Sequence, residues 1–266
     1  MLRISAAKVA EYITATSDDA VRWSTAAPPS FAGALLFVAA PSFLHSDEVK
    51  HRSKVLVHAD QTFTWHHPME VGAEVTVDAH VDRVRARGPV DFVTFDALVR
   101  HGEDTWLESR STFLLGAEAA GDPLPERKEP AVGAVAANDA APESDSTRLT
   151  MRRSASRLDL VRYAAASGDF NPIHFDHATG VGAGFGGTIV HGLLMTAWLT
   201  SLAVARTEGD APMVTAKYRF RRALYPGAQA TATAEFGETD ASGRRVDIRL
   251  ADDADLVSAR ATVREG

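Results

Sequence analysis

The segment SGDFNPIHFDH, residues 167–177, carries side chains that are suited to acid/base chemistry. Asp169 and His174 lie five residues apart, and Asn171 precedes a proline, which disfavours helical geometry for that asparagine. The chain is therefore expected to turn after Asp169 and return His174 to the same place, where the two groups can share proton transfer on one water molecule. Asn171 would orient the pair or cap the turn. The alternative is an ordinary surface turn containing a hydrogen-bonded histidine.

The segment TIVHGLL, residues 188–194, begins an apolar run and places Gly192 near its start. A glycine there lets a carbonyl group of a ligand approach the backbone closely. Free N–H groups at a helix N-terminus, together with the helix dipole, stabilise negative charge that develops on such an oxygen. The alternative is a plain helix start, with the glycine placed for packing against a sheet.

The segment KYRFRR places Lys217, Arg219 and Arg221 on one face of a strand, with aromatic side chains on the other face. Alternation of this kind is typical of a solvated face above an apolar one. A second interpretation is a contact for the phosphate groups of coenzyme A or of a carrier protein's pantetheine arm.

The same loop offers weak signals for a metal or a nucleotide. His174, Asp176 and His177 could provide metal ligands, but the sequence shows no fitting set of further ligands. The glycine-rich segment GVGAGFGG, residues 180–187, follows a loop rather than a strand, so it lacks the context of a dinucleotide site. We therefore predict no metal and no dinucleotide, and expect this segment to cover the entrance to a pocket.

The overall composition excludes several classes of protein. The chain has 266 residues, 45% of them apolar and 24% charged, which is typical of a soluble protein with one or two domains. Its net charge of -7 argues against nucleic-acid binding, and the absence of cysteine fits a reducing compartment. The N-terminus lacks a signal-peptide core, and the apolar stretch 31–44 is broken by Pro41. We expect a cytoplasmic protein with no membrane span.

The sequence indicates two repeats on either side of a central linker. Segment 116–146 is rich in Ala, Pro, Glu and Asp and has neither helical nor strand periodicity, as expected of a linker. On either side of it, AAKVAEYITATSDD is similar to SRLDLVRYAAASGD when Tyr12 is matched with Tyr163. We predict an N-terminal domain at residues 1–115, a linker at 116–146 and a C-terminal domain at 147–266.

Both halves carry the same predicted elements. An amphipathic helix is followed by an apolar helix, at residues 30–39 in the first half and 191–205 in the second. Four strand-like runs follow in each half, at 63–72, 73–87, 91–100 and 105–115, and at 218–227, 228–236, 244–252 and 256–264. A long buried helix wrapped by a curved antiparallel sheet is the hotdog arrangement, so we predict a double hotdog of the α+β class.

Residues 163–195, YAAASGDFNPIHFDHATGVGAGFGGTIVHGLLM, resemble the signature of the MaoC-like, (R)-specific enoyl-thioester hydratase/dehydratase family. That signature runs Ser-Gly-Asp, one residue, Asn-Pro-x-His-x-Asp and, after a spacer, Ile-x-His-Gly, and every position is present. The first half lacks the Asp-x-Asn-Pro and the following histidine, and it resembles the degenerate N-terminal repeat of two-repeat dehydratases.

The resemblance implies a reaction and a role for each residue. Asp169 and His174 would activate the water that adds to the β-carbon of a trans-2-enoyl thioester, or dehydrate a (3R)-hydroxyacyl thioester in reverse. Asn171 would order the loop, and the Gly192 amide would bind the thioester oxygen. The substrate would be an acyl thioester of coenzyme A or of an acyl carrier protein, with no cofactor beyond that carrier group. Weaker candidates for contacts with the loop, the substrate or its phosphates are Ser167, Thr200, Arg219 and Arg221.

Three alternative functions stay open at this point. The protein could hydrate a branched dicarboxylic acyl-CoA of the mesaconyl or itaconyl type, hydrolyse acyl thioesters, or serve as a non-catalytic scaffold subunit. In the favoured hypothesis the first half supplies much of the acyl pocket. One chain would then imitate the homodimer of single-repeat relatives, so a monomer could be active, with a homodimer as the alternative.

Overall fold

The computed structural model describes residues 1–44, 46–47, 49, 56–116, 138, 143–144 and 147–266. The described elements of the first half are β1 (Leu2–Arg3), α1 (Ala6–Thr16), β2 (Ala26–Ala27), η1 (Pro29–Phe31), α2 (Ala32–Leu44), β3 (Leu56–Trp65), β4 (Met69–Glu70), β5 (Glu74–Arg87), β6 (Val90–His101) and β7 (Asp104–Leu115). Those of the second half are β8 (Glu143–Ser144), β9 (Arg148–Arg153), α4 (Arg157–Ser167), η2 (Pro172–His174), α5 (His177–Gly182), α6 (Gly192–Ala203), η3 (Val204–Arg206), β10 (Met213–Phe220), β11 (Ala230–Asp240), β12 (Gly243–Asp252) and β13 (Val257–Glu265).

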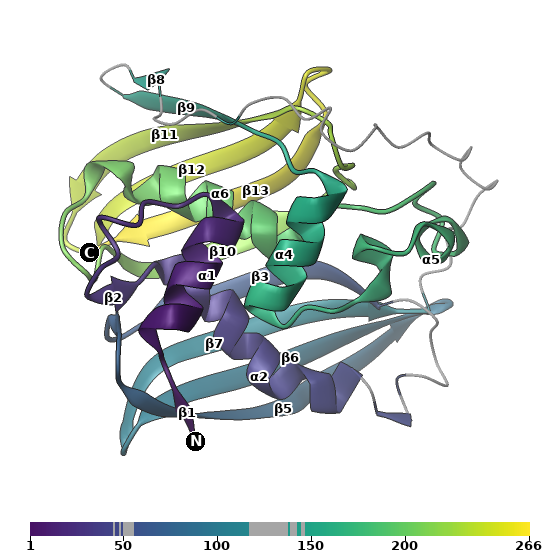
Figure 1. Ribbon diagram of the computed structural model, residues 1–266, viewed down its shortest axis with the longest axis horizontal. Helices are drawn as coiled ribbons and strands as arrows, with labels where there is room; N and C mark the ends of the chain where they lie inside the picture. Colours follow the sequence, from purple (N-terminus) through teal and green to yellow (C-terminus); the bar gives the residue numbers. More distant parts are fainter. Residues whose placement is uncertain (45, 48, 50–55, 117–137, 139–142, 145–146) are drawn as a thin grey trace.

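A large antiparallel sheet runs through both halves of the molecule. Its described strands follow the order β1-β5-β6-β7-β3-β10-β13-β12-β11-β9-β8, so each half occupies one side and β3 pairs with β10 in the middle. The sheet curves around the helices, with α6 lying against the second half and α2 against the first (Figure 1). This arrangement confirms the predicted α+β hotdog class.

The first helix of each half is bounded by capping residues. Ser5 and Ser156 accept backbone N–H groups in the first turns of α1 and α4, and Ser156 belongs to a capping box. Both helices end at a residue with left-handed backbone, Ser17 at φ 55° and Gly168 at φ 83°. The two helices pack against each other. The sharp end of α4 is what sends the chain into the loop that holds Asp169.

The long helices α2 and α6 bury their apolar side chains in one continuous core. Helix α2 extends past the predicted end through Pro41. The proline is tolerated because it falls in the last turn, where only the hydrogen bond to the Phe37 carbonyl is lost. None of the helices in the described ranges is both long and apolar enough to cross a membrane.

Most strands lie where they were predicted, with two shifts and one omission. The strands predicted at 63–72 and 218–227 begin and end earlier, at Leu56–Trp65 and Met213–Phe220. Pro68 and Pro226 follow their ends, and a proline cannot donate to a sheet ladder. Strand β9 was not predicted, although its alternating Leu149 and Met151 are buried in the core.

Much of the predicted linker at 116–146 lies outside the described residues, so the domain boundaries at 1–115 and 147–266 stay predictions. Within that segment the Asn138 side chain accepts a hydrogen bond from the Ser154 backbone N–H at 2.7 Å. Strand β8 pairs with β9 in the same region. The C-terminal end of the segment is therefore attached to the second half.

The insertion after α4 packs tightly on itself, which gives a test of the fold. A Cβ on Gly180 would lie 2.2 Å from the Gly187 carbonyl oxygen, whereas one on Gly182 in the same helix meets nothing within 4 Å. We expect Gly180→Ala to lower the free energy of unfolding by about 1–3 kcal/mol, because the backbone must move to admit the methyl group. Urea denaturation measures this change. Gly182→Ala is the matched control and should be neutral; equal stability of the two variants would contradict the described packing.

Candidate active site

The last turn of α4 positions Asp169. The Ser167 hydroxyl donates to the Tyr163 carbonyl at 2.7 Å and accepts the Asp169 backbone N–H at 3.2 Å. The Asp169 side chain is buried, and its carboxylate accepts the Asn171 backbone N–H at 3.3 Å. Ser167 thus hydrogen-bonds to the backbone at the start of the loop and does not line the cavity.

Asn171 and His174 are held by partners on other elements. The Asn171 side chain caps η2 by accepting the Ile173 N–H at 3.4 Å, and it donates to the Leu56 carbonyl of β3 at 3.1 Å. His174 Nδ1 lies 2.9 Å from the Ile189 carbonyl. Because a carbonyl only accepts hydrogen bonds, Nδ1 carries the proton and Nε2 keeps its lone pair. The loop therefore presents a basic nitrogen whose tautomer is determined by the fold.

A third side chain, His191, joins Asp169 and His174. The three residues are buried, and one donor or acceptor atom of each lies within 4.8 Å of the others. The two imidazole rings stack with centroids 3.7 Å apart, and His191 Nε2 donates to the Asp169 carbonyl at 3.2 Å. His191 was not among the predicted site residues, although its place beside Gly192 was an available signal.

Burial shifts the pKa values of the pair in opposite directions. Burial raises the pKa of Asp169 to about 7, although the hydrogen bond from the Asn171 backbone acts to lower it. Burial also lowers the pKa of His174 to about 4, although the hydrogen bond to the Ile189 carbonyl acts to raise it. The pKa of His191 lies well below its usual range because of burial and then because of the neighbouring His174. At pH 7 both imidazoles are neutral, while Asp169 is divided between its protonated and ionised forms.

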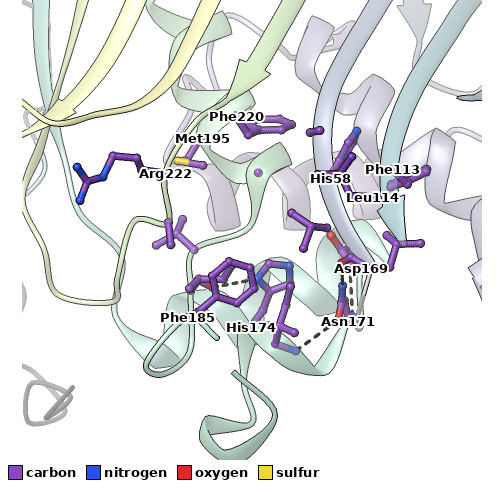
Figure 2. Close-up of a pocket in the computed structure, with 18 of the residues that line it drawn as sticks. His58, Phe113, Leu114, Asp169, Asn171, His174, Phe185, Met195, Phe220 and Arg222 are labelled. Carbon is purple, nitrogen blue, oxygen red and sulfur yellow. Dashed lines mark hydrogen bonds between the residues drawn. The ribbon is translucent and has the colours of Figure 1, made fainter. Parts of the chain in front are cut away.

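A cavity of about 210 Å³ opens onto this pair (Figure 2). The first half lines it from α2, β3 and β7, with side chains that include Phe37, Leu44, Leu56, His58 and Phe113. The second half lines it from the loop, α6 and the end of β10, with Asp169, His174, Phe185, Met195 and Phe220 among others. A largely apolar wall with a few convergent polar groups is typical of a site for a small, mostly apolar ligand.

Gly192 brings the backbone of α6 to the same cavity. It is the first residue of the helix, and its N–H has no hydrogen-bond partner among the described residues, as expected for a first-turn N–H. A Cβ at this position would lie 3.1 Å from the Phe220 ring. Glycine therefore permits the close approach, and the exposed N–H with the helix dipole can hold a negatively charged oxygen.

Thr200 does not line this cavity. It lies two turns further along α6, where its hydroxyl donates to the Thr196 carbonyl at 2.8 Å and lies 2.6 Å from the Tyr218 hydroxyl. All of these groups belong to the buried core between α6 and β10. A direct contact between Thr200 and a ligand in the cavity is not supported by this position.

The structure separates the two arginines that were predicted together. Arg219 lies on the exposed face of β10 and forms an ion pair with Asp60 of β3 at 3.4 Å. Arg221, just beyond the strand, lines the cavity, as does the neighbouring Arg222, which was not predicted. The Arg222 guanidinium points away from Asp169 and His174 (Figure 2). The Arg222 cation thus lies apart from the acid/base pair.

The first half carries a degenerate counterpart of the loop. The buried rings of Tyr12 and Tyr163 lie 6.0 Å apart, and the register that matches them also matches Asp18 with Asp169. In that register Trp23 stands where the second half has its histidine. Its indole N–H donates to Asp18 at 3.2 Å, and burial raises the pKa of Asp18. An indole offers no lone pair to accept a proton, so the counterpart lacks a base.

Two family models match the chain. The model described as "MaoC like domain" matches residues 139–255, which include the Asp169–His174 loop and Gly192, and the model described as "FAS1-like, dehydratase domain region" matches residues 6–106. The second half of the chain thus contains a MaoC-like domain, and the first half matches a dehydratase region. The chain is of the two-repeat type, with one hotdog unit in each half.

Individual relatives of this MaoC-like protein match parts or all of it. A UPF0336 protein of Cutibacterium acnes is 29% identical over 114 residues, which are 42% of this chain and 80% of that protein. The mitochondrial 3-hydroxyacyl-[acyl-carrier-protein] dehydratase of Arabidopsis thaliana is 36% identical over 69 residues, 26% of this chain and 41% of that protein. HtdX of Mycobacterium tuberculosis is 23% identical with a TM-score of 0.72, over 100% of this chain and 97% of its own. The likeness to HtdX shows that the fold is shared over the whole chain.

The same three side chains raise the question of a metal ion. Among the described residues, Asp169, His174 and His191 are grouped closely enough to serve as ligands, and each histidine donates its other nitrogen to a carbonyl, as metal-bound histidines do. However, the rings are stacked with planes only 22° apart. Their lone pairs therefore lie in nearly parallel, offset planes and cannot meet at one nearby point, whereas zinc needs ligands that converge. The set does not fit a metal ion unless one ring turns.

We therefore expect Zn²⁺ or Co²⁺, added in small excess, to leave the Tm of the protein unchanged. A bound metal would raise Tm by stabilising the folded state. Calorimetry measures the shift, and the visible absorption of Co²⁺ reports its coordination directly. His174→Ala serves as the control for binding elsewhere. A rise in Tm, or a tetrahedral cobalt spectrum, that is lost in His174→Ala would show that the trio binds metal.

Proposed function

We propose that this protein hydrates trans-2-enoyl thioesters of coenzyme A or of an acyl carrier protein, and dehydrates (3R)-hydroxyacyl thioesters in reverse. One observation carries the proposal: Asp169 and His174 meet at the wall of an apolar cavity with their pKa values shifted in opposite directions. Paired groups of this kind divide into an acid and a base. An acyl chain would occupy the apolar cavity, and the free N–H of Gly192 would receive the thioester oxygen.

The backbone of α6 would activate the substrate. When the Gly192 N–H donates to the thioester oxygen, it stabilises the enolate that forms as water adds to C3. The positive end of the helix dipole acts in the same direction. Because the thioester itself stabilises negative charge at C2, the proposed reaction needs neither a metal nor a redox cofactor. Asn171 contributes by tying the loop to β3 through the Leu56 carbonyl.

The acid/base pair would then move two protons. Neutral His174 accepts a proton from water at Nε2 while the water oxygen bonds to C3 and the C2–C3 π bond breaks. Protonated Asp169 donates its proton to C2. Transfer of a proton from the imidazolium to the carboxylate restores both groups, and dehydration follows the same steps backwards.

The described cavity also bears on the alternatives. Arg221 and Arg222 line the cavity, and the Arg222 guanidinium points away from the pair, so this cation is not placed beside the pair to receive the second carboxylate of a branched dicarboxylic acyl-CoA (Figure 2). Both halves of the chain line this cavity, as expected if one chain imitates the homodimer of single-repeat relatives. Release of free thiol would identify a thioesterase, and lack of any activity would favour a scaffold.

The first test uses crotonyl-CoA hydration, followed by the loss of enoyl absorbance. We expect Asp169→Asn and His174→Ala each to lower kcat by about 10²–10⁴-fold, because each removes one proton-transfer group. Asp176→Asn is the matched control, since Asp176 is exposed on the same loop and only caps α5. That variant should keep the wild-type rate. Full activity in either of the first two variants would exclude the proposed acid/base pair.

The pH dependence of kcat/KM for crotonyl-CoA gives a second test. In the active form Asp169 is protonated and His174 is neutral. Below about pH 4 His174 gains a proton and cannot accept one from water, and above about pH 7 Asp169 loses the proton that it donates. We expect kcat/KM to be highest between these values and to fall on both sides. A rate that rises through pH 7 to a plateau would instead identify ionised Asp169 as the base.

A further inference from the structure

His191 immediately precedes helix α6, and its buried side chain contacts both members of the acid/base pair. Its Nε2 donates to the Asp169 carbonyl at 3.2 Å, and its ring stacks on the His174 ring with centroids 3.7 Å apart. His191 is not among the described residues that line the cavity. Any effect of this side chain on a ligand in the cavity would therefore pass through its neighbours.

The two members of the pair are anchored separately. In the described part of the chain, no hydrogen bond joins the Asp169 carboxylate to the His174 ring: the carboxylate accepts the Asn171 backbone N–H, and the ring bonds to the Ile189 carbonyl. Proton transfer through one water molecule needs both groups at a defined separation. His191 contacts both, because its N–H holds the backbone of one and its ring lies against the face of the other.

The hydrogen bonding of His191 shows which of its features this position uses. Because Nε2 donates to a carbonyl, Nδ1 carries the lone pair, and Nδ1 is buried with no hydrogen-bond partner among the described residues. Buried polar atoms in folded proteins nearly always have partners, so the unpaired Nδ1 calls for an explanation. Phenylalanine would stack equally but leave the Asp169 carbonyl unpaired, and glutamine would supply an N–H but no ring. Histidine is the small side chain that offers a flat ring and an N–H together.

We propose that His191 is a positioning residue for the proton transfers: its N–H fixes the place of Asp169, and its ring fixes the plane of His174. This inference rests on the proposed hydratase function. The next residue is Gly192, whose N–H would receive the thioester oxygen, so one position at the start of α6 relates the acid, the base and the oxygen-binding site. His191 itself takes no proton, because burial and then the neighbouring His174 hold its pKa well below the usual range.

The test measures kcat and KM for crotonyl-CoA hydration in three variants. His191→Ala removes both contacts and should lower kcat by about 10–100-fold, because a displacement of about 1 Å between reacting groups has an effect of this size. His191→Phe keeps the ring and His191→Gln keeps an N–H, so the kcat of each should lie between those of His191→Ala and wild type. In His191→Phe and His191→Gln, KM should change by less than about threefold, since His191 does not line the cavity.

The pH profile separates positioning from other roles. In His191→Phe the pair stays buried, so kcat/KM should be lower at every pH while its limits near pH 4 and pH 7 stay in place. Limits that move toward the ordinary pKa values would show that water had entered a loosened site. Thr200→Val is the matched control, because Thr200 is buried in the same helix without lining the cavity. That variant should keep the wild-type kcat, KM and pH limits.

Three results would overturn the inference. The first is a wild-type kcat in His191→Phe or in His191→Gln, since one of the two contacts would then be dispensable. The second is a loss that appears in KM alone, and the third is a displacement of the pH limits in His191→Phe. If His191→Phe does not fold, the kcat, KM and pH limits of His191→Gln decide. Failure of the proposed function is distinguishable, because wild type itself would then hydrate no enoyl thioester.

Discussion

The pairing of β3 with β10 is the contact on which the rest of the structure depends, because it joins two curved sheets along one line. β3 begins at Leu56, whose carbonyl accepts a hydrogen bond from Asn171 of the Asp169–His174 loop. β10 ends at Phe220, which covers Gly192 and contacts His58. The cavity lies at this junction between the halves. Neither half could enclose it alone, since each contributes one wall.

The pKa values of Asp169 and His174 follow from their burial at this junction. Burial is the largest cause of the pKa shifts at Asp169 and at His174, and it moves a carboxylic acid and an imidazole in opposite directions. The same apolar surroundings thus provide a proton donor and a proton acceptor without any ion pair between them. His191 completes the arrangement, because its ring covers one face of His174 and its N–H holds the Asp169 backbone.

The parts of the site that could be predicted are those encoded locally. Asp169, Asn171 and His174 lie within one turn whose geometry Asn-Pro dictates, and Gly192 lies at the first residue of an apolar run. Helix and strand periodicity likewise placed most elements of both halves. Thr200 could not be excluded from the site beforehand, because an apolar helix that is buried all round does not reveal which face meets the cavity.

Contacts between residues that are far apart in the chain could not be predicted from the sequence. His58 reaches the cavity only because β3 pairs with β10, and no local pattern links it to a loop more than a hundred residues away. Arg219 and Arg221 share one strand pattern. Arg219 lies within β10 and forms an exposed ion pair, whereas Arg221 lies just beyond the end of the strand and lines the cavity. Helix α2 continues past Pro41 because the proline falls in a last turn, which depends on where tertiary packing ends the helix.

The Asp18–Trp23 contact in the first half has an evolutionary consequence. In a symmetric assembly of identical subunits, every mutation appears on both sides of the dyad, so a histidine that acts in one copy cannot become a tryptophan in the other. Joining both repeats in one polypeptide removes that symmetry. The cavity wall of the first half and the loop that holds Asp169 and His174 can then diverge independently, and selection for a new ligand need not disturb the proposed reaction.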